Sequence, residues 1–228
     1  MILRLLILTL AMAPLSGCYL MQAAMGQLEI VRKREPIAEV IARPSTPAPL
    51  RTRLEYVSSA REFASNELGL PDNKSYRSYA DLERPYVVWN VFATDEFSVE
   101  PRRWCFPIAG CVVYRGYFNE TRAENYARKL RFDGEDTNVG GVAAYSTLGH
   151  FDDPILNTML VWNDVQLAGT LFHELAHQVV YVPGESEFNE AFATVVEEAG
   201  LERWLKKRDR VQEMRTWYTQ RERSEQFI

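Results

Sequence analysis

Leu171-Phe172-His173-Glu174-Leu175-Ala176-His177 lies within residues 163–181, where apolar residues recur at helical spacing. Residues four positions apart share one face of a helix, separated by about 40° around its axis. The imidazoles of His173 and His177 can therefore converge on one metal ion. Glu174 is one position further round the helix, where its carboxylate can reach a water at that ion without being a ligand.

A third ligand is needed, because a catalytic zinc site has three protein ligands and one open position. No histidine follows His177, so we expect this ligand to be a carboxylate. The best candidate is Glu190, at the start of a helix predicted over 186–205. The Pro183-Gly184 turn before it should bring this helix back over the first. The rival carboxylates are Glu187, Glu197 and Glu198.

Glu197 follows Glu190 by two helical turns on the same face. Its carboxylate could accept a hydrogen bond from a ligand imidazole and so fix the imidazole tautomer. A glutamate on a helix is more commonly a solvated surface residue, and the sequence leaves both interpretations open.

The His-Glu-x-x-His pattern resembles the motif of the zinc metallopeptidases. Asn189-Glu190-Ala191-Phe192-Ala193 is similar to the glutamate-ligand segment of the gluzincins. This resemblance implies one Zn²⁺ held by His173, His177 and Glu190, with Glu174 as the general base. Gluzincins often stabilise the tetrahedral oxyanion with a tyrosine or a histidine. Tyr145 is the first candidate for that role, and the other candidates are Tyr181 and His150.

A wider resemblance covers nearly the whole chain, to about Leu205. Several segments together resemble the zinc aminopeptidase lipoproteins of Gram-negative bacteria: residues 105–107 (CFP), 114–118 (YRGYF), 144–149 (AYSTLG), 151–154 (FDDP), 172–178 (FHELAHQ) and 188–194 (FNEAFAT). The resemblance implies hydrolysis of a peptide or protein substrate, most directly by an aminopeptidase. The alternatives are an endopeptidase of the cell envelope and a non-catalytic lipoprotein with a structural zinc site. A structural site needs no general base, so Glu174 argues against the last.

The N-terminus has the pattern of a secretory signal over residues 1–17. Arg4 precedes an apolar run over 5–13, and Leu15-Ser16-Gly17-Cys18 looks like a bacterial lipobox. We therefore expect Cys18 to be lipidated and to anchor the mature protein to a membrane. Tyr19, next to it, favours an outer-membrane location facing the periplasm. The alternative is an ordinary signal peptide in which the cysteine occurs by chance.

The remaining two cysteines support an oxidising compartment. Cys105 and Cys111 flank a short segment that can form a tight loop, so the sequence predicts a disulfide between them. Two unpaired buried cysteines are the alternative.

The order of the predicted elements favours an α+β fold. After the signal, residues 18–50 comprise a helix over 19–35 and a proline-rich tether; the helix lies either at the membrane or against the folded domain. A metallopeptidase domain is expected over 51–228. Its predicted strands precede its last helices: strands at 86–93, 111–118 and 139–145; helices at 54–68, 120–130, 163–181, 186–205 and 208–225. The resemblance implies a gluzincin-like domain, with a small mixed or antiparallel sheet followed by an active-site helix and a glutamate-ligand helix.

The composition is that of an ordinary globular protein, with 46% hydrophobic and 25% charged residues. The formal net charge is -5 at pH 7, and the sequence has no basic stripe. A mildly acidic chain without such a stripe is a poor ligand for nucleic acid. The expected partners are therefore a peptide substrate and a membrane.

Overall fold

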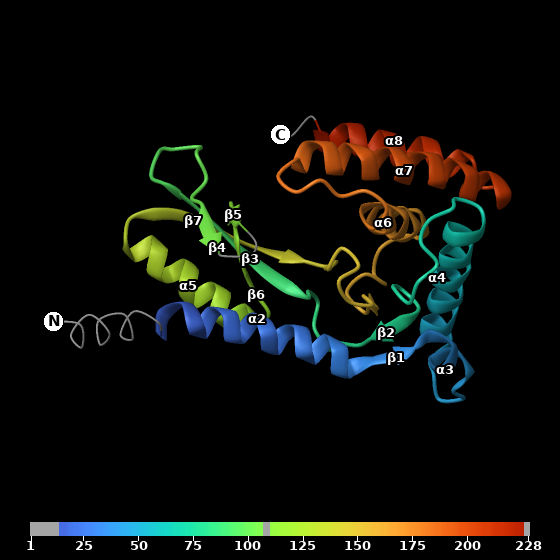
Figure 1. Ribbon diagram of the computed structural model, residues 1–228, viewed down its shortest axis with the longest axis horizontal. Helices are drawn as coiled ribbons and strands as arrows, with labels where there is room; N and C mark the ends of the chain where they lie inside the picture. Colours follow the sequence, from blue (N-terminus) through green and yellow to red (C-terminus); the bar gives the residue numbers. More distant parts are fainter. Residues whose placement is uncertain (1–13, 107–109, 226–228) are drawn as a thin grey trace. The chain divides into compact units, whose positions relative to one another are not determined.

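The computed structural model describes residues 14–106 and 110–225, and it is a mixed α+β structure (Figure 1). Two compact units are formed by interleaved parts of the chain. Unit 1 comprises the described residues up to Lys33 together with Leu82–Tyr145. Unit 2 comprises Arg34–Asp81 and the described residues from Ser146 onward. Most of the signal segment expected at residues 1–17 lies outside the described residues.

Unit 1 is built on an antiparallel three-stranded sheet in the order β6-β3-β7. The central strand β3 (Val88–Asp95) pairs with β6 (Arg115–Tyr117) and β7 (Glu135–Val142). Alternate residues of β3 share one face, and the helix α5 (Glu120–Phe132) contacts this sheet. Together they form a core of Trp89, Val91, Ala93, Trp104, Tyr117, Ala123, Ala127 and Leu130.

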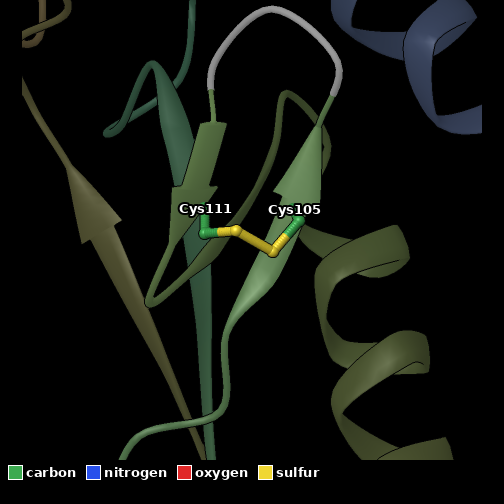
Figure 2. The surroundings of a disulfide bond; sticks show 2 residues. All are labelled: Cys105 and Cys111. Atoms are coloured by element: carbon green, nitrogen blue, oxygen red, sulfur yellow. A yellow bond between two sulfur atoms is a disulfide. The ribbon is translucent and has the colours of Figure 1, made fainter. Parts of the chain in front are cut away.

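A separate hairpin in unit 1 joins β4 (Trp104–Phe106) to β5 (Gly110–Val112). Cys105 lies opposite Cys111 in this hairpin, and the two are joined by a disulfide, the pairing expected from the sequence (Figure 2). The single strand predicted over 111–118 is wrong. Its first part pairs with β4 and its last part, β6, pairs with β3, so the chain has to turn between two different partners.

The predicted helix at 19–35 corresponds to most of α2 (Pro14–Lys33), which packs within unit 1. The Gln22 amide donates to the carbonyl of Gly116 (3.1 Å) and accepts from the N–H of Phe118 (3.2 Å). The outward face of α2 still carries exposed apolar side chains: Leu20, Met21, Met25 and Leu28. None of the helices in the described ranges is long and apolar enough to cross a membrane.

Unit 2 contains the mixed sheet β1-β2-β8, in which β2 (Ser78–Ala80) is antiparallel to β1 (Arg34–Pro36) and parallel to β8 (Ile155–Leu156). Between β1 and β2 lie α3 (Ile37–Ala42) and α4 (Ala48–Asn66).

The proline-rich tether expected before residue 51 is therefore not an extended linker. Ile37 and Val40 are buried on α3, and α4 already begins at Ala48, with Pro49 in its first turn where a proline is tolerated. The apolar residues among the prolines give this segment a packed structure.

Three helices complete unit 2: α6 (Asp164–His177), α7 (Ser186–Lys207) and α8 (Gln212–Glu225). They are in contact with one another, and α4 contacts both α6 and α7 (Figure 1). The helix predicted over 163–181 ends earlier, at His177. The β-branched pair Val179-Val180 has a low helix propensity, and the Pro183-Gly184 turn follows shortly after it. The core of this part of unit 2 includes Leu54, Phe63, Leu167, Leu171, Phe172, Leu175, Leu201, Trp204 and Leu205.

Candidate metal centre

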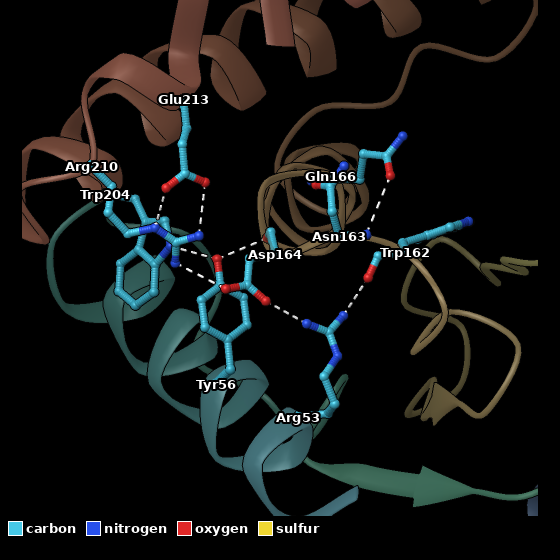
Figure 3. A network of polar contacts seen from close by, with 9 residues as sticks. All are labelled: Arg53, Tyr56, Trp162, Asn163, Asp164, Gln166, Trp204, Arg210 and Glu213. Carbon is cyan, nitrogen blue, oxygen red and sulfur yellow. Dashed lines mark hydrogen bonds and ion pairs between the residues drawn. The ribbon is translucent and has the colours of Figure 1, made fainter. Parts of the chain in front are cut away.

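The helix α6, which carries both predicted histidine ligands, has a strongly defined N-terminus. Asn163 and Gln166 form a capping box, in which the Asn163 side chain accepts from the backbone N–H of Gln166 (2.9 Å). Asp164, in the first turn, accepts from the guanidinium groups of Arg53 and Arg210 (Figure 3). A carboxylate at this end of a helix is also stabilised by the helix dipole. The start of α6 is thus fixed by residues from α4 and from the α7–α8 connection.

A second link joins α4 and the start of α6 to α7 itself. The hydroxyl of Tyr56 on α4 donates to the backbone carbonyl of Asp164 (2.8 Å) and accepts from the indole N–H of Trp204 on α7 (3.0 Å) (Figure 3). Burial is the main reason that the pKa of Tyr56 is raised, so its hydroxyl stays protonated and able to donate.

Two glycines allow α7 to pack closely on α6. A Cβ atom on Gly169 would lie 2.7 Å from Oε1 of Glu197, and one on Gly200 would lie 2.9 Å from the ring of Phe172. The two helices run in opposite directions: Glu197 on α7 lies beside His173, and Glu190, two turns earlier on α7, lies beside His177, one turn later on α6. This antiparallel return brings Glu190 and Glu197 beside the histidines of α6.

The three predicted ligands lie together. Nε2 of His173 is 3.1 Å from Nε2 of His177 and 3.2 Å from Oε2 of Glu190. Nε2 of His177 is 3.6 Å from Oε1 of Glu190. A zinc ion with tetrahedral bonds of ~2.0–2.1 Å holds its ligand atoms roughly 3.3 Å apart. The three side chains therefore already have the spacing of three corners of a zinc tetrahedron, and among the described residues they form a group of three with no fourth ligand.

The other ring nitrogen of His173 faces Glu197. Nδ1 lies 3.2 Å from Oε2 of Glu197, whose side chain is only 16% exposed. Burial lowers the pKa of His173, but the hydrogen bond and charge of Glu197, together with the charges of Glu174 and Glu190, outweigh burial and raise the pKa overall. Glu197 thus contacts a ligand imidazole without belonging to the ligand group.

His177 is the more buried of the two histidines, with 5% of the residue exposed. Burial lowers its pKa, and the positive charge of His173 lowers it further. A neutral imidazole is the form that binds a metal ion. Its Nδ1 atom is buried and has no hydrogen-bond partner among the described residues.

Glu174 is half-buried beside the ligand group. Burial raises the pKa of its carboxyl, and the hydroxyl of Ser146 and the charge of His173 partly offset this effect. A carboxyl group whose pKa is raised towards neutrality can both accept and return a proton. The site therefore combines three side chains that could hold a metal ion with an adjacent half-buried carboxyl group.

A comparison with protein families found one match. A family model described as Putative aminopeptidase matches residues 18–228. The chain belongs to this family. Its membership is consistent with peptidase activity. No curated protein and no solved structure gave a match.

Several other residues predicted from the sequence lie outside the ligand group of this Putative aminopeptidase chain. Tyr145 belongs to unit 1, where its ring meets Phe118 edge to face at 5.7 Å, and its role at the oxyanion stays a prediction. Glu198 forms an ion pair with Arg221 (3.1 Å). The remaining candidates are largely exposed: Tyr181, His150 and Glu187. Lipidation of Cys18, within α2, also stays a prediction.

The structure adds three polar residues that the sequence-based prediction of the site missed. Ser146, Asp153 and Tyr76 lie near Glu174 in unit 2. Ser146 and Asp153 fall in segments, 144–149 and 151–154, that carry the family resemblance, so the sequence contained an indication that these two residues belong to the site. Tyr76 is a single tyrosine in an irregular segment and gave no such signal.

Proposed function

We propose that this chain hydrolyses peptide bonds, most directly as an aminopeptidase, with one zinc ion held by His173, His177 and Glu190. The observation that carries the proposal is the spacing of the three ligand atoms, which matches a zinc tetrahedron with one open corner. Membership of the Putative aminopeptidase family supports the same reaction class.

A zinc ion at this site would acidify a water molecule and polarise the scissile carbonyl. Glu174 would accept the proton from that water and return it to the leaving amine. Its half-buried carboxyl suits both steps, because burial raises its pKa. Glu197 would hold the His173 ring so that Nε2 presents its lone pair to the ion.

Two alternatives remain to be tested against this proposal. An endopeptidase would use the same residues and would differ only in substrate, because an aminopeptidase also needs a group that binds the free α-amine. A structural zinc site closes its fourth position with another protein ligand, and the described residues supply only three ligands. The half-buried carboxyl of Glu174 beside the histidines also favours a catalytic site.

The test combines metal content with hydrolysis. Wild-type protein should contain about one zinc per chain, and Glu190→Ala should lose most of it; Glu187→Ala, which alters an exposed carboxylate of the same helix, should retain it. Peptides with free and with blocked N-termini then distinguish an aminopeptidase from an endopeptidase. Glu174→Gln should keep the zinc but lose hydrolysis by at least about 100-fold. A zinc-loaded Glu174→Gln variant that cleaves peptides at the wild-type rate would refute the mechanism.

We further propose that Cys18 carries the lipid anchor of the mature protein in the cell envelope, at the outer membrane facing the periplasm. The Leu15-Ser16-Gly17-Cys18 sequence supports this proposal. Mass spectrometry of the N-terminal peptide should find an acylated Cys18, and Cys18→Ser should release the protein from the membrane fraction. An unmodified Cys18 in membrane-bound protein would contradict the proposal.

A further inference from the structure

One face of α2 carries apolar side chains that the rest of unit 1 leaves uncovered. This apolar face, whose members are between 43% and 62% exposed, consists of Leu20, Met21, Met25 and Leu28. Positions 21, 25 and 28 have the spacing of one helical face. A different face, with Gln22, Gly26 and Ile30, is buried against unit 1. Single exposed apolar residues are common, but a contiguous row of them indicates a contact surface.

An open groove of about 520 Å³ borders the apolar face. It lies between α2 and the start of α5, and its apolar lining comes from Met25, Leu28 and Phe118. The Phe118 ring packs directly on Gly26, because a Cβ atom on that glycine would lie 2.0 Å from the ring. All the residues that line the groove belong to unit 1. The apolar face is thus continuous with a groove formed within one unit.

Two arginines of this groove lack a counter-charge. Arg32 on α2 and Arg122 on α5 are exposed, and neither forms an ion pair with the described residues. Glu29 and Lys33, which also line the groove, each form an ion pair elsewhere in unit 1 (2.7 and 3.2 Å). The whole chain has a formal net charge of -5. The two arginines therefore make a local positive site on an acidic protein, and such a site attracts an anionic group.

We propose that this surface binds an anionic phospholipid membrane, with the apolar face at the boundary between headgroups and acyl chains and with Arg32 and Arg122 at the phosphate groups. A helix that combines an apolar face with cationic side chains binds a membrane in this way, parallel to its surface. Cys18 belongs to the same helix and precedes Met21 by less than one turn. A lipid on Cys18 would therefore hold the apolar face close to the bilayer.

A second copy of the chain is a poorer partner for this surface. Two copies that paired through the same face would bring the unpaired arginines of both copies together. Like charges placed opposite each other weaken an interface, whereas the phosphates of a bilayer neutralise them. The charge of the groove therefore favours a lipid surface.

Vesicle binding by protein without a lipid anchor tests the proposal. The protein is the chain from residue 18 onward with Cys18→Ser, the mature form that the lipobox predicts without its lipid, so that side chains alone can bind. It should sediment with vesicles that contain phosphatidylglycerol, and salt should weaken this binding. Met25→Ser/Leu28→Ser should lower the partition coefficient by at least about 10-fold. The matched control is Phe97→Ser, which removes a 97%-exposed aromatic ring elsewhere in unit 1 and should bind normally.

The arginines are tested by the lipid charge. Arg32→Gln/Arg122→Gln should lower binding to phosphatidylglycerol vesicles by about 10- to 30-fold at low salt, because each cation contributes separately. Binding to neutral phosphatidylcholine vesicles should stay unchanged. Arg128→Gln is the control, since it removes an exposed arginine of α5 that does not line the groove, and it should change binding by less than about twofold.

A fluorescent label tests which face meets the lipid. Cys105 and Cys111 are joined in a disulfide, so Met25→Cys in the Cys18→Ser protein creates a single free thiol. An environment-sensitive fluorophore at residue 25 should shift to shorter wavelength when phosphatidylglycerol vesicles are added, and a lipid-borne nitroxide should quench it. The same label on Phe132→Cys, at a 91%-exposed position at the end of α5, should show neither change.

Three results would overturn the proposal. The first is the absence of binding to phosphatidylglycerol vesicles, and the second is an equal loss of binding in Phe97→Ser. The third is a label at residue 25 that is already shielded without vesicles, in a dimer that Met25→Ser/Leu28→Ser abolishes; this result would assign the surface to a second copy. Because the Cys18→Ser protein carries no lipid, these outcomes do not depend on whether Cys18 is acylated.

Discussion

Oε2 of Glu197 lies 3.2 Å from Nδ1 of His173, while Nε2 of the same ring lies 3.2 Å from Oε2 of Glu190. A carboxylate that accepts from Nδ1 leaves the lone pair on Nε2, which is the atom placed in the ligand group. Glu197, a residue of α7 outside the group of His173, His177 and Glu190, is therefore placed to favour the His173 tautomer with its lone pair on Nε2.

Removing this carboxylate should weaken metal binding without removing a ligand. Glu197→Ala should lower zinc affinity by about 10- to 100-fold, the range typical of partners of metal-bound histidines. Competition with a chromophoric chelator measures the affinity. Glu198→Ala is the matched control, since it deletes the neighbouring carboxylate, which pairs with Arg221, and should leave the affinity unchanged. Equal losses in the two variants would show that only net charge matters.

The carboxylate of Glu174 should destabilise the metal-free chain. Burial raises the folded-state pKa of Glu174, so folding favours its protonated form. The resulting penalty is absent below the ordinary pKa of about 4.3 and develops as the pH rises through the folded-state pKa. Glu174→Gln should therefore raise the melting temperature of metal-free protein by about 2–4 °C at pH 8, corresponding to about 1 kcal/mol. The gain should shrink towards pH 5.

Thermal unfolding at several pH values provides the measurement for this prediction. Glu187→Gln, an exposed carboxylate, serves as the control and should show no such pH-dependent gain. A Glu174→Gln variant that is less stable than wild type at pH 8 would mean that the carboxylate is stabilised by its surroundings.

The grouping of His173, His177 and Glu190 could be predicted from the sequence because the information is local. The spacing of His173 and His177 fixes their common face on any helix, and the Pro183-Gly184 turn predicts the return that brings Glu190 to them. The start of α6 at Asp164 could also be predicted from the sequence, because Asn163 and Gln166 have the spacing of a capping box.

The surroundings of Glu174 could not be predicted in this way. Tyr76 and Ser146 come from irregular segments 70 residues apart, and the first of these is held by buried hydrogen bonds from Arg61. The division of 111–118 into β5 and β6 likewise depends on which strand each half pairs with. Such long-range pairing leaves no periodic signal in the chain.

Asp164 should contribute to stability through its two arginines. Its carboxylate accepts from Arg53 and Arg210, and all three side chains are less than one-third exposed, so solvent screens these contacts only in part. Asp164→Ala should lower the free energy of unfolding by about 1–3 kcal/mol. Asp72→Ala removes an exposed ion-pair partner of Arg77 and should change stability by less than about 0.5 kcal/mol. Chemical denaturation measures the free energy of unfolding of both variants. Equal losses would show that the contacts of Asp164 with its two arginines stabilise the fold no more than an exposed ion pair does.

Gly169 should control metal affinity through packing alone. An alanine inside a helix usually stabilises it by roughly 0.5–1 kcal/mol relative to glycine. At Gly169, however, the new Cβ atom would lie 2.7 Å from Oε1 of Glu197, so the carboxylate has to move away from His173. Gly169→Ala should therefore lower zinc affinity severalfold, in the direction of Glu197→Ala.

Gly200→Ala is the contrasting variant, because its Cβ atom would meet the Phe172 ring and a Leu68 methyl group at 2.9 Å and touch no carboxylate. It should cost about 1–3 kcal/mol of stability through overpacking while zinc affinity stays near the wild-type value. The double variant Gly169→Ala/Glu197→Ala tests whether Gly169→Ala lowers zinc affinity by displacing Glu197. If the glycine acts through Glu197, the second substitution adds little further loss of affinity; fully additive losses would show that Gly169 affects the metal centre by another route.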